Sequence, residues 1–265
     1  MPTQYSTVTF MVMTRAVCCL VLLVQPLAVH CSRSTISIGS SLKLTLEQEF
    51  EGAEEGSVIW DASRGFLAHI VRRQQASDDR VRGARVLELG AGTGVVGIAL
   101  SRLGAKSVVL TDLPGQLPLI SRNLVHNQPE CCASRCVLCA NVALTEVKVL
   151  CWEPGQWRES APTLAVPDSF DLIVACDCVY PGQSSDHLAA VLLELLELNP
   201  SATILLAVER RPPPAEAPPG TDHLGDFLAR MRARCDVERV PDDELDPAWN
   251  YDELSIWRMR HGTGS

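Results

Sequence analysis

The sequence predicts an α/β protein with a Rossmann-like, doubly wound and mostly parallel seven-stranded sheet, an antiparallel C-terminal edge and a short N-terminal β-hairpin. Two observations lead to this prediction. From Arg85 onward, short apolar runs typical of buried strands alternate with helical patterns, as in sheets whose parallel strands are joined by helices. Residues 86–97, VLELGAGTGVVG, add a glycine-rich turn between one such strand and the following helix.

Residues 1–34 form an N-terminal extension whose role the sequence leaves open. Its apolar run, residues 16–24, follows Arg15 and has the outline of a signal-peptide core. The run is too short to span a bilayer as a helix, which takes about 20 residues. We expect an extension ahead of a cytosolic domain without stable membrane association, with targeting or membrane tethering as the alternatives.

Residues 35–265 are predicted to form one domain. Alternating apolar residues over 35–50 predict the N-terminal β-hairpin. Apolar residues at helical spacing predict a helix over 60–73, with Asp61 and Ser63 as its caps.

The strands and helices of the sheet then follow in order. Parallel strands are predicted at 85–89, 106–112, 146–152, 170–177 and 203–210. Helices are predicted at 93–103, 117–126 and 186–198. A proline-rich surface connection, 211–220, leads to a helix at 222–234 and to strands at 235–240 and 254–260, which predict the antiparallel edge.

Composition narrows the function classes. The net charge of −9 argues against a general nucleic-acid binder, because such proteins carry basic surfaces that displace counterions from phosphate. A small molecule or a protein is therefore the expected partner. The 11 cysteines are odd in number and several lie in apolar runs, which favours reduced cytosolic thiols over a disulfide framework.

The glycine-rich turn fits two ligand classes. From Gly92 it spells G-x-G-x-x-G, which is typical of a dinucleotide pyrophosphate site. From Glu88 it spells E-x-G-x-G-x-G, which suits a nucleoside without phosphate. Gly90, Gly92 and Gly94 serve either ligand, and a purely structural turn is a third possibility.

Two carboxyl groups near the turn, those of Asp112 and Glu88, bear on which ligand class binds. Asp112 ends the second parallel strand, where a carboxylate accepts hydrogen bonds from ribose in both ligand classes. We expect Glu88 to stand at the mouth of the turn, where it would repel a pyrophosphate and suit the cationic S-adenosylmethionine. A solvated or internally paired strand residue is the alternative for Glu88.

Several motifs together resemble a known family. In order and spacing, the segments WDAS (60–63), VLELGAGTGVVGIAL (86–100), VLTDLP (109–114), VLCW (149–152) and ACDCVY (175–180) are similar to those of the seven-stranded lysine methyltransferases called family 16. The resemblance covers roughly residues 35–260. Within the family, VER at 208–210 and the acidic stretch before LSIWRMR look most like the members that methylate valosin-containing protein.

The resemblance implies S-adenosylmethionine as cofactor and assigns its contacts. Trp60 would cover the cofactor, with Trp152 beside the adenine, although each tryptophan taken alone could be a core aromatic. The remaining implied contacts are the turn residues Gly90, Ala91 and Gly92 at the methionine end, Asp112 at the ribose, and Cys176, where the family pattern leads us to expect alanine.

The acceptor chemistry is assigned to DCVY, which ends the fourth parallel strand. Asp177 can accept a hydrogen bond from a lysine ammonium and help it lose a proton, and Tyr180 can offer its ring face to the cation. Glu209 is a further candidate at the lysine entrance, with a plain surface charge as the alternative. An N-P-P-Y motif, expected of enzymes that methylate DNA bases or glutamine amides, is missing, which favours an amine acceptor.

A cysteine cluster lies between the third predicted strand and the helix before it. Cys136 and Cys139 have zinc-knuckle spacing, but four ligands within so short a segment can seldom reach one ion, so we predict no metal site.

The expected function is therefore a monomeric protein-lysine methyltransferase acting on a protein such as a chaperone or an AAA ATPase, valosin-containing protein among them. Two alternatives remain at this point. One is a cofactor-binding interaction protein without catalysis, and the other is an NAD-dependent oxidoreductase.

Overall fold

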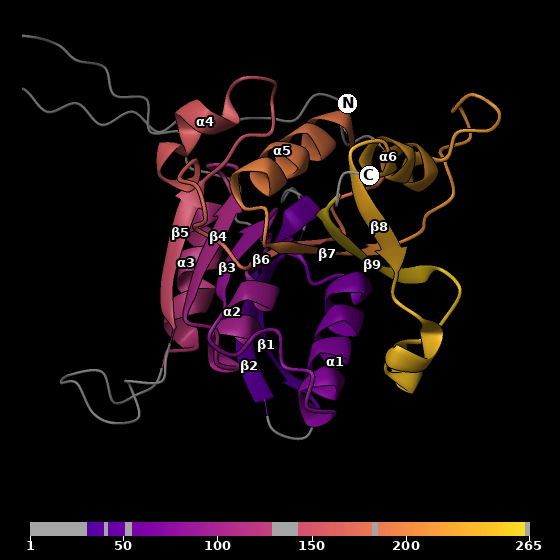
Figure 1. Ribbon diagram of the computed structural model, residues 1–265. Coiled ribbons are helices and arrows are strands. Elements are labelled where there is room, and N and C mark those ends of the chain that lie inside the picture. Colours follow the sequence, from indigo (N-terminus) through magenta and orange to yellow (C-terminus); the bar gives the residue numbers. More distant parts are fainter. Residues whose placement is uncertain (1–30, 40–41, 51–54, 129–142, 182–184, 263–265) are drawn as a thin grey trace, which may run out of the picture.

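The computed structural model describes residues 31–39, 42–50, 55–128, 143–181 and 185–262, and its centre is a seven-stranded sheet (Figure 1). The strand order is β5-β4-β3-β6-β7-β9-β8. Five neighbouring strands are parallel: β3 (Arg85–Leu89), β4 (Ser107–Asp112), β5 (Leu144–Val149), β6 (Leu172–Cys176) and β7 (Thr203–Glu209). The last two, β8 (Cys235–Arg239) and β9 (Leu254–His261), form the edge, with β9 antiparallel to both neighbours. The predicted fold class is confirmed.

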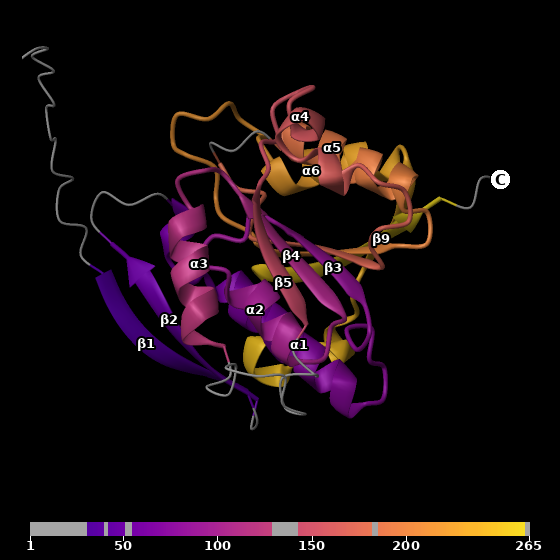
Figure 2. The ribbon, with the colours of Figure 1, turned by 90° about the vertical axis from the view of Figure 1, so that its left-hand side faces the viewer.

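Helices cover both faces of the sheet (Figures 1 and 2). One face carries α1 (Asp61–Gln75), α2 (Val95–Arg102) and α3 (Leu117–His126). The other carries α4 (Trp157–Ser160), α5 (Ser185–Leu198) and α6 (His223–Arg232). Among the described residues, 3-10 helices lie in the connections at Glu55–Ser57, Pro162–Leu164, Asp242–Glu244 and Pro247–Trp249.

The strand β3 shows how the two hydrophobic layers are built. Its side chains alternate between the faces of the sheet, as in any strand. Val86 packs in the layer of α1 and α2, whereas Leu87 and Leu89 pack in the layer of α5 and α6. Glu88 therefore shares the face of Val86 and is directed toward α2.

The N-terminal hairpin is a separate two-stranded sheet, β1 (Cys31–Ile38) and β2 (Leu42–Glu49), which packs against α3 (Figure 2). It begins at Cys31, inside the predicted extension. Leu44 and Leu46 are fully buried in the core. Asn123 of α3 accepts a hydrogen bond from the Glu47 backbone N–H at 2.6 Å and donates to the Glu47 carbonyl at 3.0 Å. The hairpin thereby closes the core below α3.

Some boundaries differ from the prediction. Trp60 is the N-cap residue of α1 and no side chain caps it, so the predicted capping by Asp61 and Ser63 is wrong. Asp61 instead lies in the first turn, where a carboxylate is favourable to the helix dipole. Because β5 ends at Val149, Trp152 lies beyond the strand and not within it. The short helix α4 was not predicted.

The apolar run at 16–24 and the cysteine cluster at 131–139 lie outside the described residues. Within the described ranges, no helix combines the length and the apolar character needed to cross a bilayer.

Candidate active site

A pocket of about 900 Å³ lies at the carboxyl edge of the parallel strands. This is where ligands bind in open α/β sheets, because the connections leaving neighbouring strands diverge there. The structure brings nine of the predicted site residues together in its lining: Trp60, Gly90, Ala91, Gly92, Asp112, Trp152, Cys176, Asp177 and Tyr180. Two predicted residues, Glu88 and Glu209, do not line it.

Two glycines of the turn are required by space and by backbone conformation. Gly90 and Gly92 have φ values of 63° and 56°, in the left-handed region that favours glycine. A Cβ on Gly90 would lie 2.8 Å from the Cys178 sulfur and 3.1 Å from the Trp152 ring. A Cβ on Gly92 would lie 2.6 Å from the carbonyl oxygen of Gly56. Side chains at these two positions would therefore displace residues that line the pocket.

One amide of the turn and one in the first turn of α2 already bond to the protein's own carboxyl groups. The Gly92 N–H donates to Asp112 at 2.7 Å, and the Gly97 N–H donates to Glu88 at 2.7 Å. In a pyrophosphate site such amides point at the ligand, because they compensate its negative charge. Here acidic groups take those positions, so this turn is poorly suited to a pyrophosphate.

The expected position of Glu88 at the mouth of the turn is wrong. Its side chain is buried beneath the turn, on the α2 side of the sheet, and does not line the pocket. Burial raises the pKa of Glu88 to about 8, so the carboxyl is mostly neutral at pH 7. It therefore holds the Gly97 amide and does not present a charge to the pocket.

The floor and rim of the pocket are fixed by short contacts. The Asp112 carboxylate also accepts a hydrogen bond from the Leu113 N–H at 2.7 Å, which holds it at the rim. Cys178 donates to the Cys176 carbonyl at 3.4 Å and to the Leu89 carbonyl at 3.5 Å. Burial raises the pKa of both thiols well above the usual value, so they are neutral walls of the pocket.

Asp177 follows β6 in an unusual backbone conformation. Its φ is 58°, which is uncommon outside glycine and best tolerated by Asp and Asn. The Asp177 N–H donates to the Ala207 carbonyl at 2.7 Å, and the side chain is only 2% exposed. Non-glycine residues with this geometry are often found at functional sites, where the surrounding structure holds them in place.

The Asp177 carboxylate is engaged by Arg211. The guanidinium donates to both of its oxygens, at 2.9 and 2.5 Å, in the fork geometry of a strong arginine–carboxylate pair. The same guanidinium lies 3.6 Å from the Glu209 carboxylate and 4.8 Å from the centre of the Trp60 ring. Glu209 thus joins the site through Arg211 and not as a residue of the pocket lining.

Comparison with known proteins identifies the family. A family model described as lysine methyltransferase matches residues 39–231. The chain belongs to this family. It is 30% identical over 216 residues to "EEF1A lysine methyltransferase 3" of Xenopus tropicalis, which covers 78% of this chain and 80% of the relative.

A second relative agrees with this assignment, and a solved structure agrees with the fold. The mouse "Protein N-lysine methyltransferase METTL21A" is 31% identical over 168 residues, covering 63% of this chain and 67% of that protein. Among solved structures, the T. thermophilus 16S rRNA N2 G1207 methyltransferase, in complex with AdoMet and guanosine, has a TM-score of 0.53 and 17% identity. That likeness covers 90% of this chain and 52% of the other, and it supports the fold alone. The protein is an S-adenosylmethionine-dependent lysine methyltransferase.

Sequence reasoning missed several residues of this methyltransferase's pocket. Gly56 and Gln116 approach the turn from outside the recognised motifs, and Cys178 lies beneath Gly90. Arg211 was the most consequential omission. Its position directly after the VER motif was a usable signal, since an arginine two residues beyond a strand-end glutamate lies at the same sheet edge.

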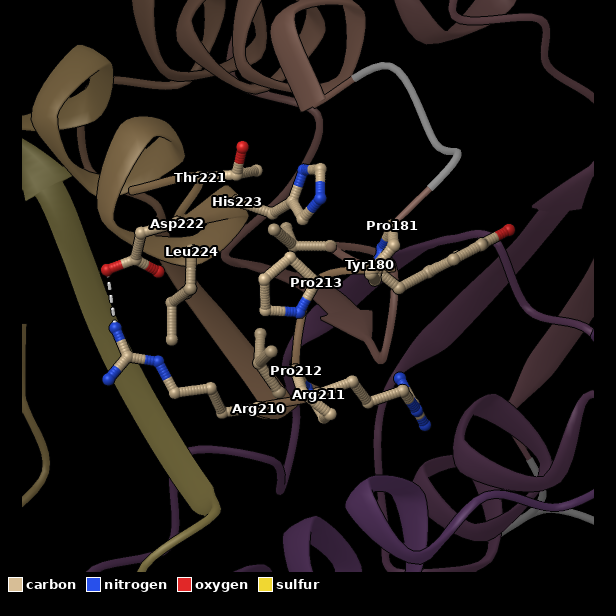
Figure 3. A pocket seen from close by; sticks show the side chains of 12 residues that line it. Tyr180, Pro181, Arg210, Arg211, Pro212, Pro213, Thr221, Asp222, His223 and Leu224 are labelled. Atoms are coloured by element: carbon tan, nitrogen blue, oxygen red, sulfur yellow. Dashed lines mark hydrogen bonds and ion pairs between the residues drawn. The ribbon is translucent and has the colours of Figure 1, made fainter. Parts of the chain in front are cut away.

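A second pocket of about 370 Å³ adjoins the active site of the methyltransferase (Figure 3). It lies between the start of α6 and the proline-rich segment, and it shares four lining residues with the larger pocket: Tyr180, Pro181, Arg211 and Pro212. Figure 3 shows that Arg210 and Arg211 extend in opposite directions, with Arg210 paired to Asp222 at 2.5 Å.

In the described ranges, no three His, Cys, Asp or Glu side chains lie together so that they could hold a metal ion.

Proposed function

We propose that the protein transfers a methyl group from S-adenosylmethionine to the side-chain nitrogen of a lysine in a protein substrate. One observation carries this proposal. A single pocket joins a glycine cradle suited to a nucleoside without phosphate to a buried carboxylate, Asp177, at the same sheet edge.

The residues present fit the cofactor. The cradle of Gly90 and Gly92 admits a ligand against bare backbone, and a volume of about 900 Å³ is large enough for a nucleoside with an amino-acid tail. We assign Asp112 to the ribose hydroxyls, because its carboxylate is held at the rim by two backbone amides. Trp152, beside Gly90, would flank the adenine, and Trp60 would cover the cofactor.

S-adenosylmethionine, when bound, supplies a methyl group on a sulfonium and leaves as the neutral thioether S-adenosylhomocysteine. The protein must present a neutral amine to that methyl group, whereas a free lysine, with a pKa of about 10.4, is protonated at neutral pH. Asp177 would accept a hydrogen bond from the ammonium, hold its nitrogen in line and direct one proton to water. The lone pair of the nitrogen then forms the new bond to carbon as the bond to sulfur breaks.

Tyr180 and Glu209 have supporting roles in this proposal. Tyr180 lines the pocket next to Asp177 and offers an aromatic face to a cation. Glu209 adds negative charge near the entrance. Burial raises the pKa of Glu209, with the neighbouring Asp177 adding to this and Arg211 opposing it.

The identity of the substrate protein is the finer part of the proposal. The relatives named above include one whose name states elongation factor 1A as substrate, whereas the VER motif and the acidic C-terminal stretch favour valosin-containing protein. We propose a cytosolic, monomeric enzyme that acts on a chaperone or AAA ATPase, with elongation factor 1A as the competing substrate. The acidic net charge of −9 favours a protein over nucleic acid.

Two rival functions make different predictions. An NAD-dependent oxidoreductase would need the amides of the turn and of the start of α2 for a pyrophosphate, but those of Gly92 and Gly97 bond to carboxyl groups. A non-catalytic binding protein would keep the cofactor pocket but would not depend on Asp177.

Labelling of a cell lysate with radioactive S-adenosylmethionine tests the proposal. The wild-type protein is compared with Asp177→Asn, which keeps a residue suited to a positive φ and removes only the charge. We expect a labelled protein band with the wild type and at least about a hundredfold less label with the variant. Equal labelling by the two would refute the catalytic role. Purified valosin-containing protein and elongation factor 1A, assayed side by side, decide between the candidate substrates.

A further inference from the structure

Arg211 occupies a site built for a cation. Its guanidinium bonds to both oxygens of the Asp177 carboxylate, at 2.9 and 2.5 Å, with the Glu209 carboxylate 3.6 Å away. The Trp60 ring provides a third wall, with its centre 4.8 Å from the guanidinium carbon. Two carboxylates and an aromatic face are the groups that bind an alkylammonium ion as well as they bind a guanidinium.

The electrostatics around this site also favour a cation. Asp61 and Glu253 add negative charge to that of Asp177 beside Glu209. The nearby Tyr251 reports the same potential: burial, with these carboxylates adding to it, raises its pKa to about 12. A positively charged side chain that approaches this edge of the sheet is therefore attracted to the position that Arg211 holds.

We infer that Arg211 is an internal stand-in for the acceptor lysine, and that a substrate lysine must displace it from Asp177 before methyl transfer. The inference rests on the proposed function, because it concerns the acceptor subsite of the same pocket. An arginine can hold this position beside the methyl donor without reacting, because its guanidinium stays protonated and has no lone pair suited to attack.

The chain around Arg211 permits such a displacement. Three prolines, residues 212–214, follow it, and proline has no backbone N–H with which to anchor the segment. Arg210 is anchored separately, by its ion pair with Asp222 at 2.5 Å and by its backbone N–H, which donates to the Glu253 carbonyl at 2.8 Å. Since the two side chains extend in opposite directions (Figure 3), Arg211 can leave without moving Arg210.

Replacement of Arg211 by lysine gives a direct chemical test. In Arg211→Lys, the new amine would lie in the acceptor position, with Asp177 beside it to accept its hydrogen bond. On incubation with S-adenosylmethionine, the lysine loses one proton to water, its nitrogen takes the methyl group, and S-adenosylhomocysteine is released. We expect this variant to gain the mass of one or more methyl groups, mapped to position 211 by peptide mass spectrometry. Arg210→Lys, the matched control, should gain none at position 210.

A second measurement does not depend on catalysis. In Arg211→Gln the cation site loses its internal occupant, so n-butylammonium chloride should raise the melting temperature of this variant more than sodium chloride of equal ionic strength does. The wild type, whose site is filled, should respond equally to the two salts.

The outcomes separate the two proposals. Methylation at position 211, or stabilisation of Arg211→Gln specific to butylammonium, supports the inference. The absence of both effects overturns it, while wild-type labelling of a lysate protein would leave the proposed function in place. A wild-type protein that neither binds S-adenosylhomocysteine nor labels any protein would overturn the proposed function itself.

Discussion

The carboxyl group of Glu88 lies beneath the glycine turn, out of contact with water. Glu88 is 2% exposed, and its carboxyl accepts a hydrogen bond from the Gly97 N–H. A Cβ on Gly97 would lie only 2.5 Å from the same carboxyl oxygen, so this contact requires glycine. Burial raises the pKa of Glu88 to about 8, and the charge of Asp112 contributes to the rise. This residue supports the shape of the turn and holds one of its amides.

The raised pKa of Glu88 predicts a pH dependence of stability. A carboxyl whose folded pKa is about 8 and whose unfolded pKa is near 4.5 favours the folded state fully below pH 4.5. That contribution decreases as the pH rises from 4.5 to 8, because the carboxyl is then ionised in the unfolded state but still protonated in the folded state, so unfolding releases a proton. Glu88→Gln, which does not titrate, should therefore gain stability relative to the wild type by a few kcal/mol over this range, since each pKa unit is worth about 1.4 kcal/mol. Urea denaturation at a series of pH values measures the difference, and a difference that stays constant from pH 5 to 9 would refute it.

A side chain at Gly92 should weaken cofactor binding by more than the cost of the backbone conformation alone. Gly92→Ala places a Cβ 2.6 Å from the Gly56 carbonyl, whereas Gly155, with a similar positive φ of 78°, has open space around it. Both substitutions carry a backbone cost of about 1–2 kcal/mol. We expect Gly92→Ala to lower the affinity for S-adenosylhomocysteine at least about tenfold, with Gly155→Ala unchanged by calorimetry. Equal affinities for the two variants would show that the turn is not the wall of the cofactor site.

At the scale of elements, α3 connects the hairpin to the glycine turn. Asn123 is fully buried, and besides its two bonds to the Glu47 backbone it donates to the Thr93 carbonyl at 2.9 Å. Asn127 repeats the pattern with Thr45, accepting from its N–H at 2.9 Å and donating to its carbonyl at 2.7 Å. Asn123 within α3 and Asn127 at its C-cap thus hold β2 against the helix, and Asn123 also ties the helix to Thr93 of the turn.

Removal of the Asn123 amide should loosen this connection. Asn123→Ala leaves backbone groups of Glu47 and Thr93 buried without that partner, which costs about 1–3 kcal/mol for each such group. We expect a lower free energy of unfolding in urea, together with faster amide hydrogen exchange in β2. The exposed Ser121→Ala on the same helix is the control, and a variant no less stable than this control would contradict the account.

The elements themselves were largely predictable, for a local reason. The apolar runs at 85–89 and 203–210 and the helical pattern at 117–126 carry their own signal, because the two strands are buried on both faces and the helix is buried on one. The N-cap of α1 was not predicted, because no side chain caps the helix at Trp60 and tryptophan carries no capping signal. The strand pattern alone could have shown that Glu88 points to the α2 face of the sheet, opposite to Leu87 and Leu89. The position of Glu88 just before the glycines suggested the mouth of the turn instead.

At the scale of the whole molecule, the active site assembles from segments distant in sequence. Asp177 follows β6, Arg211 follows β7 and Trp60 precedes α1, and they meet only because the sheet aligns its carboxyl ends. Motifs located Trp60 and Asp177 individually. The sequence position of Arg211 was enough to place it at this sheet edge, but its pairing with Asp177 depends on β6 and β7 being neighbours, which only the fold shows.

Cofactor binding should stabilise the entire domain, because the pocket draws on loops from both halves of the sheet. S-adenosylhomocysteine at about 100 times its Kd should add about 2.7 kcal/mol to the free energy of unfolding. Differential scanning fluorimetry with S-adenosylhomocysteine and with NAD detects this stabilisation as a rise in melting temperature. A rise in melting temperature with NAD alone would favour the oxidoreductase.

The central claim is methyl transfer to a lysine under the control of Asp177. Mass spectrometry of the protein that the wild type labels in a lysate tests it most directly, since it identifies the modified residue. The account predicts methyl groups on a lysine side chain, and none above background when Asp177→Asn replaces the wild type. Methyl groups on another residue type, or the same lysine modified equally by both proteins, would contradict it.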